Sequence, residues 1–421
     1  MKIIENGTGE ASPGKTTKDH LGKDERVIGK FPKYMTVAVI VVVIIAGAYS
    51  QMGNDDDNGN QYQDAELPTV EDVSLVRGLD ARLDVPLEWM EKDDLHDFIL
   101  NSFTEVTYLN MEHQDAVFTL MGFKDPDTDL EEIYLKSLED VVLGMYDELT
   151  ESMYMVKGFS DPIYRITLAH ELTHALQDQN FGILEFLTVK TMDERMARLG
   201  VVEGDAKMVE YSFMLELSPD DMRIIQEEHT IMSEDVEMPD FLMDYMSFPY
   251  IYGYEFVLEN YRIMRYTSVN NLYTNPPATA EQVLHPEKYF ANEPAKKVDS
   301  PLPPGDFIWQ WEDTLGEYII FMMLADHLDQ STAVEASSGW GGDKFSLYTK
   351  GDSMVGFLNT TWDTTQDADE FENALLTMLM AWEKDSGCWM SDDLYMKFCR
   401  NGNNVGLTLS LDRQSLLEFS V

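Results

Sequence analysis

The segment His170-Glu171-Leu172-Thr173-His174 constrains the fold of this chain more than any other feature of the sequence. Residues four apart lie one turn apart on the same face of a helix, so both imidazoles can bind one metal ion. Glu171 lies about 100° around the helix from His170, within reach of a water molecule on that ion. Two neutral imidazoles and a carboxylate form a typical catalytic site for Zn²⁺ with one open position. We therefore predict a zinc-binding helix with Glu171 as catalytic base.

The flanking residues predict where this helix begins and ends. Ser160 or Asp161 can cap its N-terminus, and Pro162 fits the first turn, where a missing N–H has no cost. Asn180 and Gly182 can terminate it. The chain has eight histidines in 421 residues, so a chance match to the motif is expected in about one of a hundred such sequences. The pattern therefore favours a functional metal site.

A third ligand has to come from a second helix, which we place at Asp193–Glu210. Glu203 is the preferred ligand, because the small residues Gly204 and Ala206 would let its helix pack closely against the helix of the motif. Spacing alone does not decide this choice.

Other carboxylates on the same segment stay open as the third ligand. Glu194 follows His174 at a spacing typical of the thermolysin-like arrangement, and Asp193 and Glu210 compete with it. Asp205 and Glu210 are also candidates for hydrogen bonds that orient a ligand histidine. A solvated position on the helix surface is an equally good interpretation of both.

The segments AHELTHALQDQNF and VEGDA resemble the gluzincin class of zinc peptidases. The chain is similar in more detail to a group of poorly characterised secreted or membrane-bound metallopeptidase-like proteins of bacteria and archaea, over about residues 95–412. Further similar segments lie at 144–150, 248–257, 276–289, 315–318, 340–345 and 362–371. Only the zinc motif among them is diagnostic of chemistry.

This resemblance implies that His170, His174 and Glu203 bind Zn²⁺ and that Glu171 is the base. It also implies a zincin-like fold, in which a sheet edge just before the active helix binds the substrate chain. Met145–Val156 is the segment that we place there. The implied reaction is hydrolysis of a protein or peptide substrate.

A donor to the developing oxyanion completes the predicted site. His285 is the first candidate, and Tyr250, Tyr254 and Tyr289 are weaker ones. The competing interpretation of His285 is a histidine whose hydrogen bonds hold a proline-rich loop. The alternative function is a non-catalytic zincin-fold module that binds peptides or envelope proteins around a structural zinc. Glu171 favours catalysis, because a structural site needs ligands but no base.

The apolar run Met35–Tyr49 predicts a transmembrane helix over residues 34–52. Lysines and an arginine precede it and aspartates follow it, so the positive-inside rule places residues 1–33 in the cytoplasm and the later residues outside. Cleavage near Ala48, which would give a secreted protein, is the alternative. We interpret residues 53–68 as a flexible acidic linker and 69–421 as an extracytoplasmic domain of one or two lobes.

The rest of the pattern predicts a helix-dominated α+β fold. A helix is expected at Leu95–Thr107, two short strands around a polar turn at Leu143–Val156, and an edge strand at Asn404–Leu411. Cys388 and Cys399 have a spacing that is compatible with a local disulfide outside the cytoplasm.

The charge of the chain excludes one class of partner. Asp and Glu total 77 residues against 30 Lys and Arg, for a net charge of −47. Such a surface repels phosphate backbones, so nucleic acid is not expected as a partner. The oligomeric state is left open by the sequence.

Overall fold

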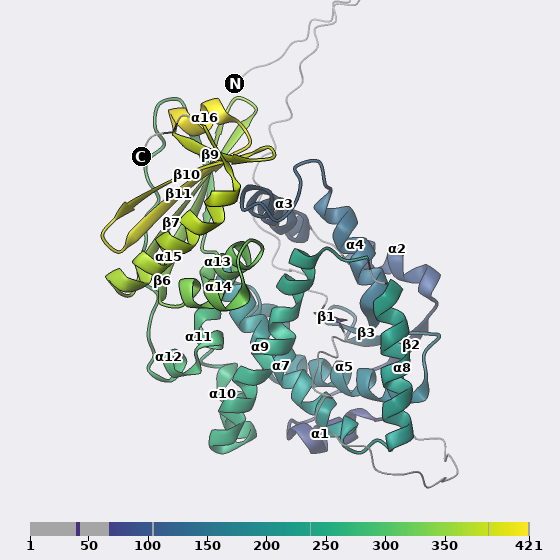
Figure 1. Cartoon of the computed structure of the whole chain (residues 1–421). Coiled ribbons are helices and arrows are strands. Elements are labelled where there is room, and N and C mark those ends of the chain that lie inside the picture. Colours follow the sequence, from purple (N-terminus) through teal and green to yellow (C-terminus); the bar gives the residue numbers. More distant parts are fainter. Residues whose placement is uncertain (1–38, 43–66, 103–104, 236, 386, 420–421) are drawn as a thin grey trace, which may run out of the picture. The chain divides into compact units, whose positions relative to one another are not determined.

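The helix of the metal-binding motif is α5, Asp161–Phe181, in the computed structural model of the chain (Figure 1). The structure describes residues 39–42, 67–102, 105–235, 237–385 and 387–419. Ser160 precedes α5 in an extended conformation and Pro162 lies in its first turn. Gly182 ends the helix in the left-handed region, with a φ of 72°. Both predicted ends are therefore confirmed.

Helices dominate the described residues between 67 and 290, and the predicted helix-rich α+β class is confirmed. Besides α5 they are α1 Val70–Arg77, α2 Lys92–Ser102, α3 Glu105–Leu120, α4 Leu130–Val141, α6 Ile183–Phe186, α7 Met192–Met214, α8 Pro219–Asp235, α9 Asp240–Met264, α10 Tyr266–Leu272, α11 Ala280–Leu284 and α12 Pro286–Phe290. The helix that was predicted at 95–107 corresponds to α2 and the beginning of α3, with residues 103–104 outside the described part.

A small sheet lies against α5. Its strands are β1 Val39–Val42, β2 Leu87–Met90, β3 Val142–Asp147 and β4 Ser152–Val156, in the order β1-β3-β4-β2. The hairpin β3–β4 confirms the two strands that were predicted around a polar turn. The segment Met145–Val156, predicted as a substrate-binding edge, is not a free edge in the structure, because β3 also pairs antiparallel with β1, and β4 also pairs parallel with β2.

The predicted transmembrane helix falls almost entirely outside the described residues. Within 34–52 only Val39–Val42 are described, and they form strand β1 rather than a helix. Among the helices that the structure describes, none is both long and apolar enough to cross a bilayer. The cytoplasmic segment 1–33, the linker up to residue 66 and the cleavage site near Ala48 also lie outside the described residues.

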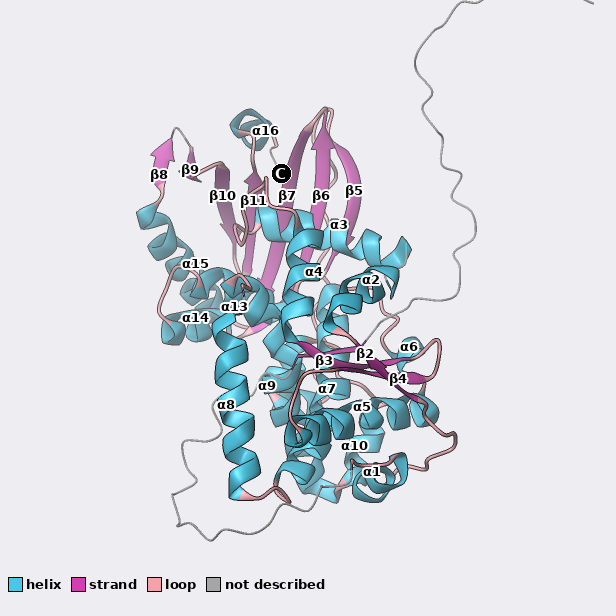
Figure 2. Cartoon of the chain, turned by 90° about the vertical axis from the view of Figure 1, so that its right-hand side faces the viewer, coloured by secondary structure: helices cyan, strands magenta, loops and turns pink. Residues whose placement is uncertain are grey.

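Helix α7 packs against α5 on one side and against α9 on another (Figures 1 and 2). A Cβ at Gly204 would lie 2.3 Å from the carbonyl oxygen of Gly253 in α9, so only glycine permits this approach. The sequence-based argument that Gly204 brings its helix close to α5 therefore named the wrong partner. The small residue fixes α7 on α9, and α7 in turn presents its carboxylates to α5.

The C-terminal region is a seven-stranded sheet with helices beside it (Figure 2). The strand order is β5-β6-β7-β11-β10-β9-β8. The elements are β5 Ile308–Asp313, α13 Gly316–Ala325, α14 Gln330–Ser337, β6 Trp340–Lys350, β7 Ser353–Trp362, α15 Thr365–Met378, the 3₁₀ turn Leu379–Ala381, β8 Glu383–Asp385, β9 Cys388–Ser391, β10 Leu394–Asn401, β11 Asn404–Ser410 and α16 Arg413–Glu418.

Two predictions for this region need correction. Strand β11 is not an edge strand, because it pairs with β7 on one side and β10 on the other. Cys388 and Cys399 form no disulfide with each other: Cys388 is buried and Cys399 is exposed. Their strands are neighbours, but Met396 rather than Cys399 pairs with the residue next to Cys388.

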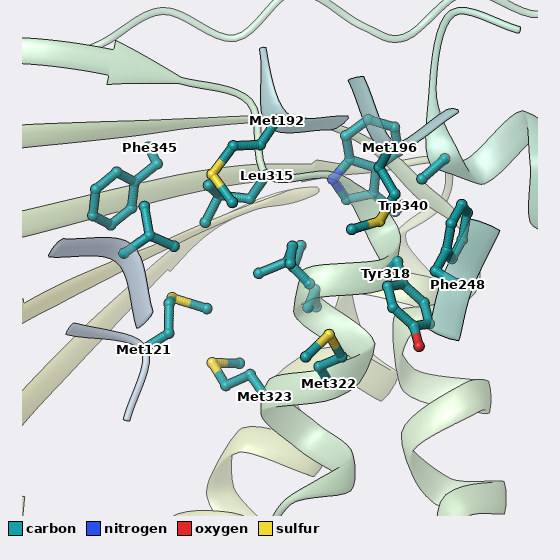
Figure 3. Packing of buried hydrophobic residues seen from close by; sticks show 14 of the residues in the cluster. Met121, Met192, Met196, Phe248, Leu315, Tyr318, Met322, Met323, Trp340 and Phe345 are labelled. Atoms are coloured by element: carbon teal, nitrogen blue, oxygen red, sulfur yellow. The ribbon is translucent and has the colours of Figure 1, made fainter. Parts of the chain in front are cut away.

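One apolar core joins α7 to the C-terminal sheet (Figure 3). Met192 and Met196 of α7 lie in it together with Trp340 and Phe345 of β6 and with Met322 of α13. All five side chains are almost fully buried. Flexible methionine side chains fill the irregular gaps between the larger rings. Burial of these apolar side chains stabilises the position of the N-terminal part of α7. This helix carries Glu203, the predicted third ligand.

Candidate metal centre

Three side chains of α5 and α7 converge on one point. The Nε2 atoms of His170 and His174 lie 3.2 Å and 3.4 Å from the same oxygen, Oε2 of Glu203. Among the described residues these three form the one group whose metal-ligating atoms all lie within 4.8 Å of one another. All three are at most 1% exposed. The structure therefore brings together the two histidines and the carboxylate that the sequence analysis preferred.

Both histidines are held from behind by their other ring nitrogen. His170 Nδ1 lies 3.0 Å from Oε2 of Glu210, and His174 Nδ1 lies 2.9 Å from Oε1 of Gln177. Both partner atoms are acceptors, so each Nδ1 carries the proton and donates it. This assignment leaves each Nε2 with a lone pair directed at the point shared with Glu203. It is the tautomer that a metal ligand needs.

A hydrogen-bond chain fixes Gln177 in this orientation. Its amide nitrogen donates to Val202 O at 3.0 Å and to Asp205 Oδ2 at 3.1 Å, which leaves the amide oxygen facing His174. Asp205 also accepts from Arg77 Nε at 2.6 Å and from the Tyr273 hydroxyl at 2.8 Å. The chain from His174 to Arg77 is buried throughout. The predicted orienting role of Asp205 is thus exerted through Gln177.

Glu210 supports the other histidine. Its second oxygen accepts from Lys207 Nζ at 2.7 Å, one turn earlier on α7. Burial raises the pKa of Glu210, but Lys207 and His170 outweigh it and hold the carboxylate below its ordinary value. Glu210 is therefore an anionic acceptor for His170 rather than a metal ligand, which confirms one of its two predicted roles.

The pKa values of the three converging groups depend on one another. Burial lowers the pKa of His170, yet hydrogen bonds to Glu203 and Glu210 raise it to about 9. Burial raises the pKa of Glu203, yet His174 and His170 lower it to about 2. In the bare protein a proton on the histidine balances the buried carboxylates. A divalent cation at the same point balances them while both histidines stay neutral.

Glu171 lies beside this point without joining it. It is fully buried, and neither carboxylate oxygen has a hydrogen-bond partner among the described residues. Burial raises its pKa to about 8, and the neighbouring His170 opposes that shift. A carboxylate with a pKa near neutrality can both accept and release a proton at physiological pH.

The donor set fits zinc. Two imidazole nitrogens and one carboxylate oxygen are the ligands of a common catalytic zinc site, which keeps a fourth position open. His174 Nε2 has no hydrogen-bond partner at normal distance, although it is fully buried. Buried polar atoms without hydrogen-bond partners are rare in folded proteins. The unpartnered Nε2 of His174 is therefore suited to bind a metal ion.

The other predicted residues lie elsewhere or have other partners. Glu194 binds Arg198 on the outside of α7 at 2.6 Å. Asp193 accepts from the backbone of Ala280 at 2.8 Å. Neither belongs to the group of described side chains whose possible ligating atoms converge, so the geometry supports neither as the third ligand.

His285 is not part of the described metal cluster either. Its Nε2 lies 3.0 Å from Glu317 of α13, and this hydrogen bond raises its pKa. The structure therefore agrees with the interpretation in which His285 holds a loop. Tyr250 of α9 is a weaker candidate for the oxyanion donor. Its ring centre lies 6.4 Å from that of His170.

Tyr254 and Tyr289, the remaining tyrosine candidates, have neighbours outside the metal cluster. The Tyr254 ring packs on Tyr211, with the ring centres 4.9 Å apart. The Tyr289 hydroxyl donates to the carbonyl of Asn275 at 2.8 Å. These contacts give neither tyrosine a place beside His170.

The sequence analysis missed Gln177, Lys207, Arg77 and Tyr273. Gln177 follows His174 by three residues and Lys207 precedes Glu210 by three, so helical spacing could have indicated both. Arg77 ends α1 and Tyr273 directly follows α10, both far away along the chain, and no local pattern connects them to the motif.

The comparison with known families covers a different part of the chain. Residues 309–413, from within β5 to the first residue of α16, match a family described as "Domain of unknown function (DUF8575)". No curated protein matches the chain, and no solved structure matches it. The matched segment does not include any residue of α5 or α7, so the metal centre is interpreted from its own geometry.

Proposed function

We propose that the chain is a zinc-dependent peptidase, with His170, His174 and Glu203 as metal ligands and Glu171 as the base. The observation that carries the proposal is the convergence of two Nε2 atoms and one carboxylate oxygen, with both Nδ1 protons fixed by Glu210 and Gln177. A structural zinc site needs such ligands but not an additional buried carboxylate beside them. Glu171 is that carboxylate.

The residues divide the chemistry among them. Zinc, when bound, polarises the substrate carbonyl and makes water acidic enough to attack it near neutral pH. Glu171 takes the proton of the attacking water and passes it to the leaving amine. Glu210 and Gln177 keep the histidines in the ligating tautomer during both steps.

The sheet beside α5 supports a peptide as the substrate. Strand β3 forms antiparallel backbone pairs with residues 39–42 of this same chain. The side of β3 that faces away from β4 can therefore pair with an extended chain. If residues 34–52 are in the membrane, as the sequence predicts, this side of β3 becomes an open edge. A substrate chain can then pair with it, as the resemblance to zincins implies. The zincin-like fold and the membrane anchor are both parts of the proposal.

The experiment compares the full-length protein with Glu171→Gln, and with Glu194→Gln as the matched control on α7. Zinc content is measured by elemental analysis, and hydrolysis is followed on a library of peptides. We expect about one zinc per chain in all three proteins. We expect the rate of hydrolysis to fall about 1,000-fold in Glu171→Gln alone, because a positioned general base contributes about 100- to 10,000-fold.

The other outcomes separate the alternatives. If all three proteins bind zinc and none cleaves any peptide, the non-catalytic peptide-binding module becomes the better proposal. If the wild-type protein binds no zinc, the metal centre itself is refuted.

A further inference from the structure

The carboxylate of Glu148 has no ion-pair or hydrogen-bond partner among the side chains that the structure describes. Glu148 is the first residue of the turn that follows β3 and is 9% exposed. Neither of its carboxylate oxygens makes a hydrogen bond to any described residue, and no described lysine, arginine or histidine forms an ion pair with it. Burial raises its pKa well above the ordinary value. Leaving a buried carboxylate unpaired is costly, so this position needs a reason.

The charged groups around Glu148 are acidic, and two of them, Asp147 and Asp178, already accept hydrogen bonds. The side chains that further raise its pKa are Asp178, Asp147 and Glu171. Asp147 accepts from the backbone of Leu149 at 3.0 Å and from the Thr150 hydroxyl at 2.7 Å.

Asp178 accepts from the backbone of Ile183 at 3.0 Å and from the Tyr146 hydroxyl at 3.2 Å. The acidic neighbours of Glu148 therefore offer it negative potential, and the one donor that acts on its pKa is its own backbone N–H. What is missing at this position is a positive charge.

Glu148 lies close to the proposed site of cleavage. The Tyr146 hydroxyl, two residues before Glu148, donates to Asp178 at 3.2 Å, and Asp178 lies one turn after His174 on α5. The end of β3 and the turn with the unpaired carboxylate therefore lie against the helix that carries Glu171. A substrate bound along β3 would pass this turn.

The pairing of β1 with β3 gives the direction of such a substrate. Val39 pairs with Tyr146, Ile40 with Met145 and Val42 with Val142. An antiparallel chain in this register has its earlier residues toward Asp147 and Glu148. The amino side of a bound peptide therefore lies at Glu148, and its carboxyl side lies toward the beginning of β3.

We propose that Glu148 binds a cationic nitrogen of the substrate, one or two residues to the amino side of the bond that is cleaved. The inference rests on the proposed peptidase function. An ammonium or guanidinium group at this position neutralises a buried carboxylate that the protein leaves unpaired. The nitrogen comes either from the α-amino group of a peptide that begins there or from a lysine or arginine side chain. Acidic substrates are rejected by the same carboxylates.

The experiment uses zinc-loaded full-length protein and matched peptides. One pair differs in lysine against norleucine at the positions just before the cleaved bond, and a second pair differs in a free against an acetylated N-terminus. Hydrolysis gives kcat/KM for each peptide. Equilibrium binding of the same peptides to Glu171→Gln protein gives a readout that needs no cleavage.

We expect the wild-type protein to favour the cationic member of one pair by about 100-fold, because truncating one side of a buried charge pair has effects of this size. The pair that responds identifies the source of the nitrogen. Glu148→Gln should lose this preference, because its rate falls far more on the cationic peptides than on the neutral ones. Glu151→Gln, an exposed residue of the same turn, should behave as the wild type. Zinc content and the melting temperature should show that all variants are folded.

The possible failures are distinct. Hydrolysis without any preference for a cation in either pair overturns the role of Glu148 and leaves the peptidase intact. An equal loss of rate on cationic and neutral peptides in Glu148→Gln also overturns it. Preferential binding of cationic peptides without hydrolysis refutes the peptidase and supports the binding role of Glu148. Neither binding nor hydrolysis refutes both.

Discussion

The molecule buries two groups of carboxylates, and it treats them differently. One group surrounds the metal centre on α5 and α7 and includes Glu171, Glu203 and Glu210. The other, which we call the junction cluster, consists of Asp193, Asp313 and Asp343, where α7 and α13 meet the C-terminal sheet.

The junction cluster is satisfied by backbone N–H groups. Asp313 Oδ1 accepts from Met192 N at 2.9 Å and Thr314 N at 2.7 Å. Asp343 accepts from the backbone nitrogens of Leu315 and Gly316, at 2.9 Å and 2.8 Å. These nitrogens lie at the beginnings of α7 and α13, where helices have unpaired donors. The carboxylates of this cluster are therefore structural caps.

The metal centre has no such supply of donors. Its carboxylates face imidazoles, Lys207 or nothing, and Glu171 and Glu148 have no hydrogen-bond partner among the described residues. The comparison teaches that burial of acids alone does not mark a functional site. A functional site is indicated by buried carboxylates whose charge is not balanced by the hydrogen-bond donors of the described residues.

The largest effect is expected for Glu203→Gln, which removes the anionic ligand. We expect the affinity for zinc to fall about 1,000-fold, more than the 10- to 100-fold typical of residues that only orient a ligand. Asp313→Asn is the matched change in the junction cluster and should leave the affinity unchanged. Titration with a competing chelator measures both. Equal affinities of Glu203→Gln and wild type would end the distinction between the two clusters.

A smaller effect is expected for Glu210→Gln. The amide of the variant still offers an oxygen to His170 Nδ1. The substitution removes the negative charge that stabilises the imidazole as a metal ligand. We expect zinc affinity to fall about 10- to 100-fold. The same chelator competition measures it, with Glu194→Gln as the control on the outer side of α7. A loss as large as that of Glu203→Gln would show that Glu210 is itself a ligand.

The sequence was sufficient for the parts of the site that lie on a single helix. The ends of α5 and the placement of His170, Glu171 and His174 on this helix follow from helical period and capping residues, which are local. The role of Gly204 and the position of β11 could not be predicted, because both depend on which element packs alongside. Arg77 reaches Asp205 from α1, and that contact exists only in the folded chain.

The smallest effect, and the one that tests the junction cluster directly, is expected for Asp313→Asn. Burial raises the pKa of Asp313 to about 7 from an ordinary 3.8, although the backbone N–H groups of Met192 and Thr314 oppose that shift. Among the charged groups that act on it, Asp343 raises this pKa and Lys344 lowers it, while Arg195 and Tyr245 also interact with Asp313.

Because the folded pKa of Asp313 lies above the unfolded one, its charge costs stability fully above pH 7, and the cost disappears as the pH falls toward 4. Asparagine keeps the accepting oxygen and removes the charge. We expect it to raise the free energy of unfolding by about 1 kcal/mol at pH 8, less than the pKa shift alone implies, because its amide needs a new acceptor. Chemical denaturation at pH 8, 6 and 4.5 should show that this gain in the free energy of unfolding becomes smaller as the pH falls. A gain that is constant over this range would mean that the carboxylate is already neutral or well solvated, and that the two clusters differ less than their hydrogen bonds indicate.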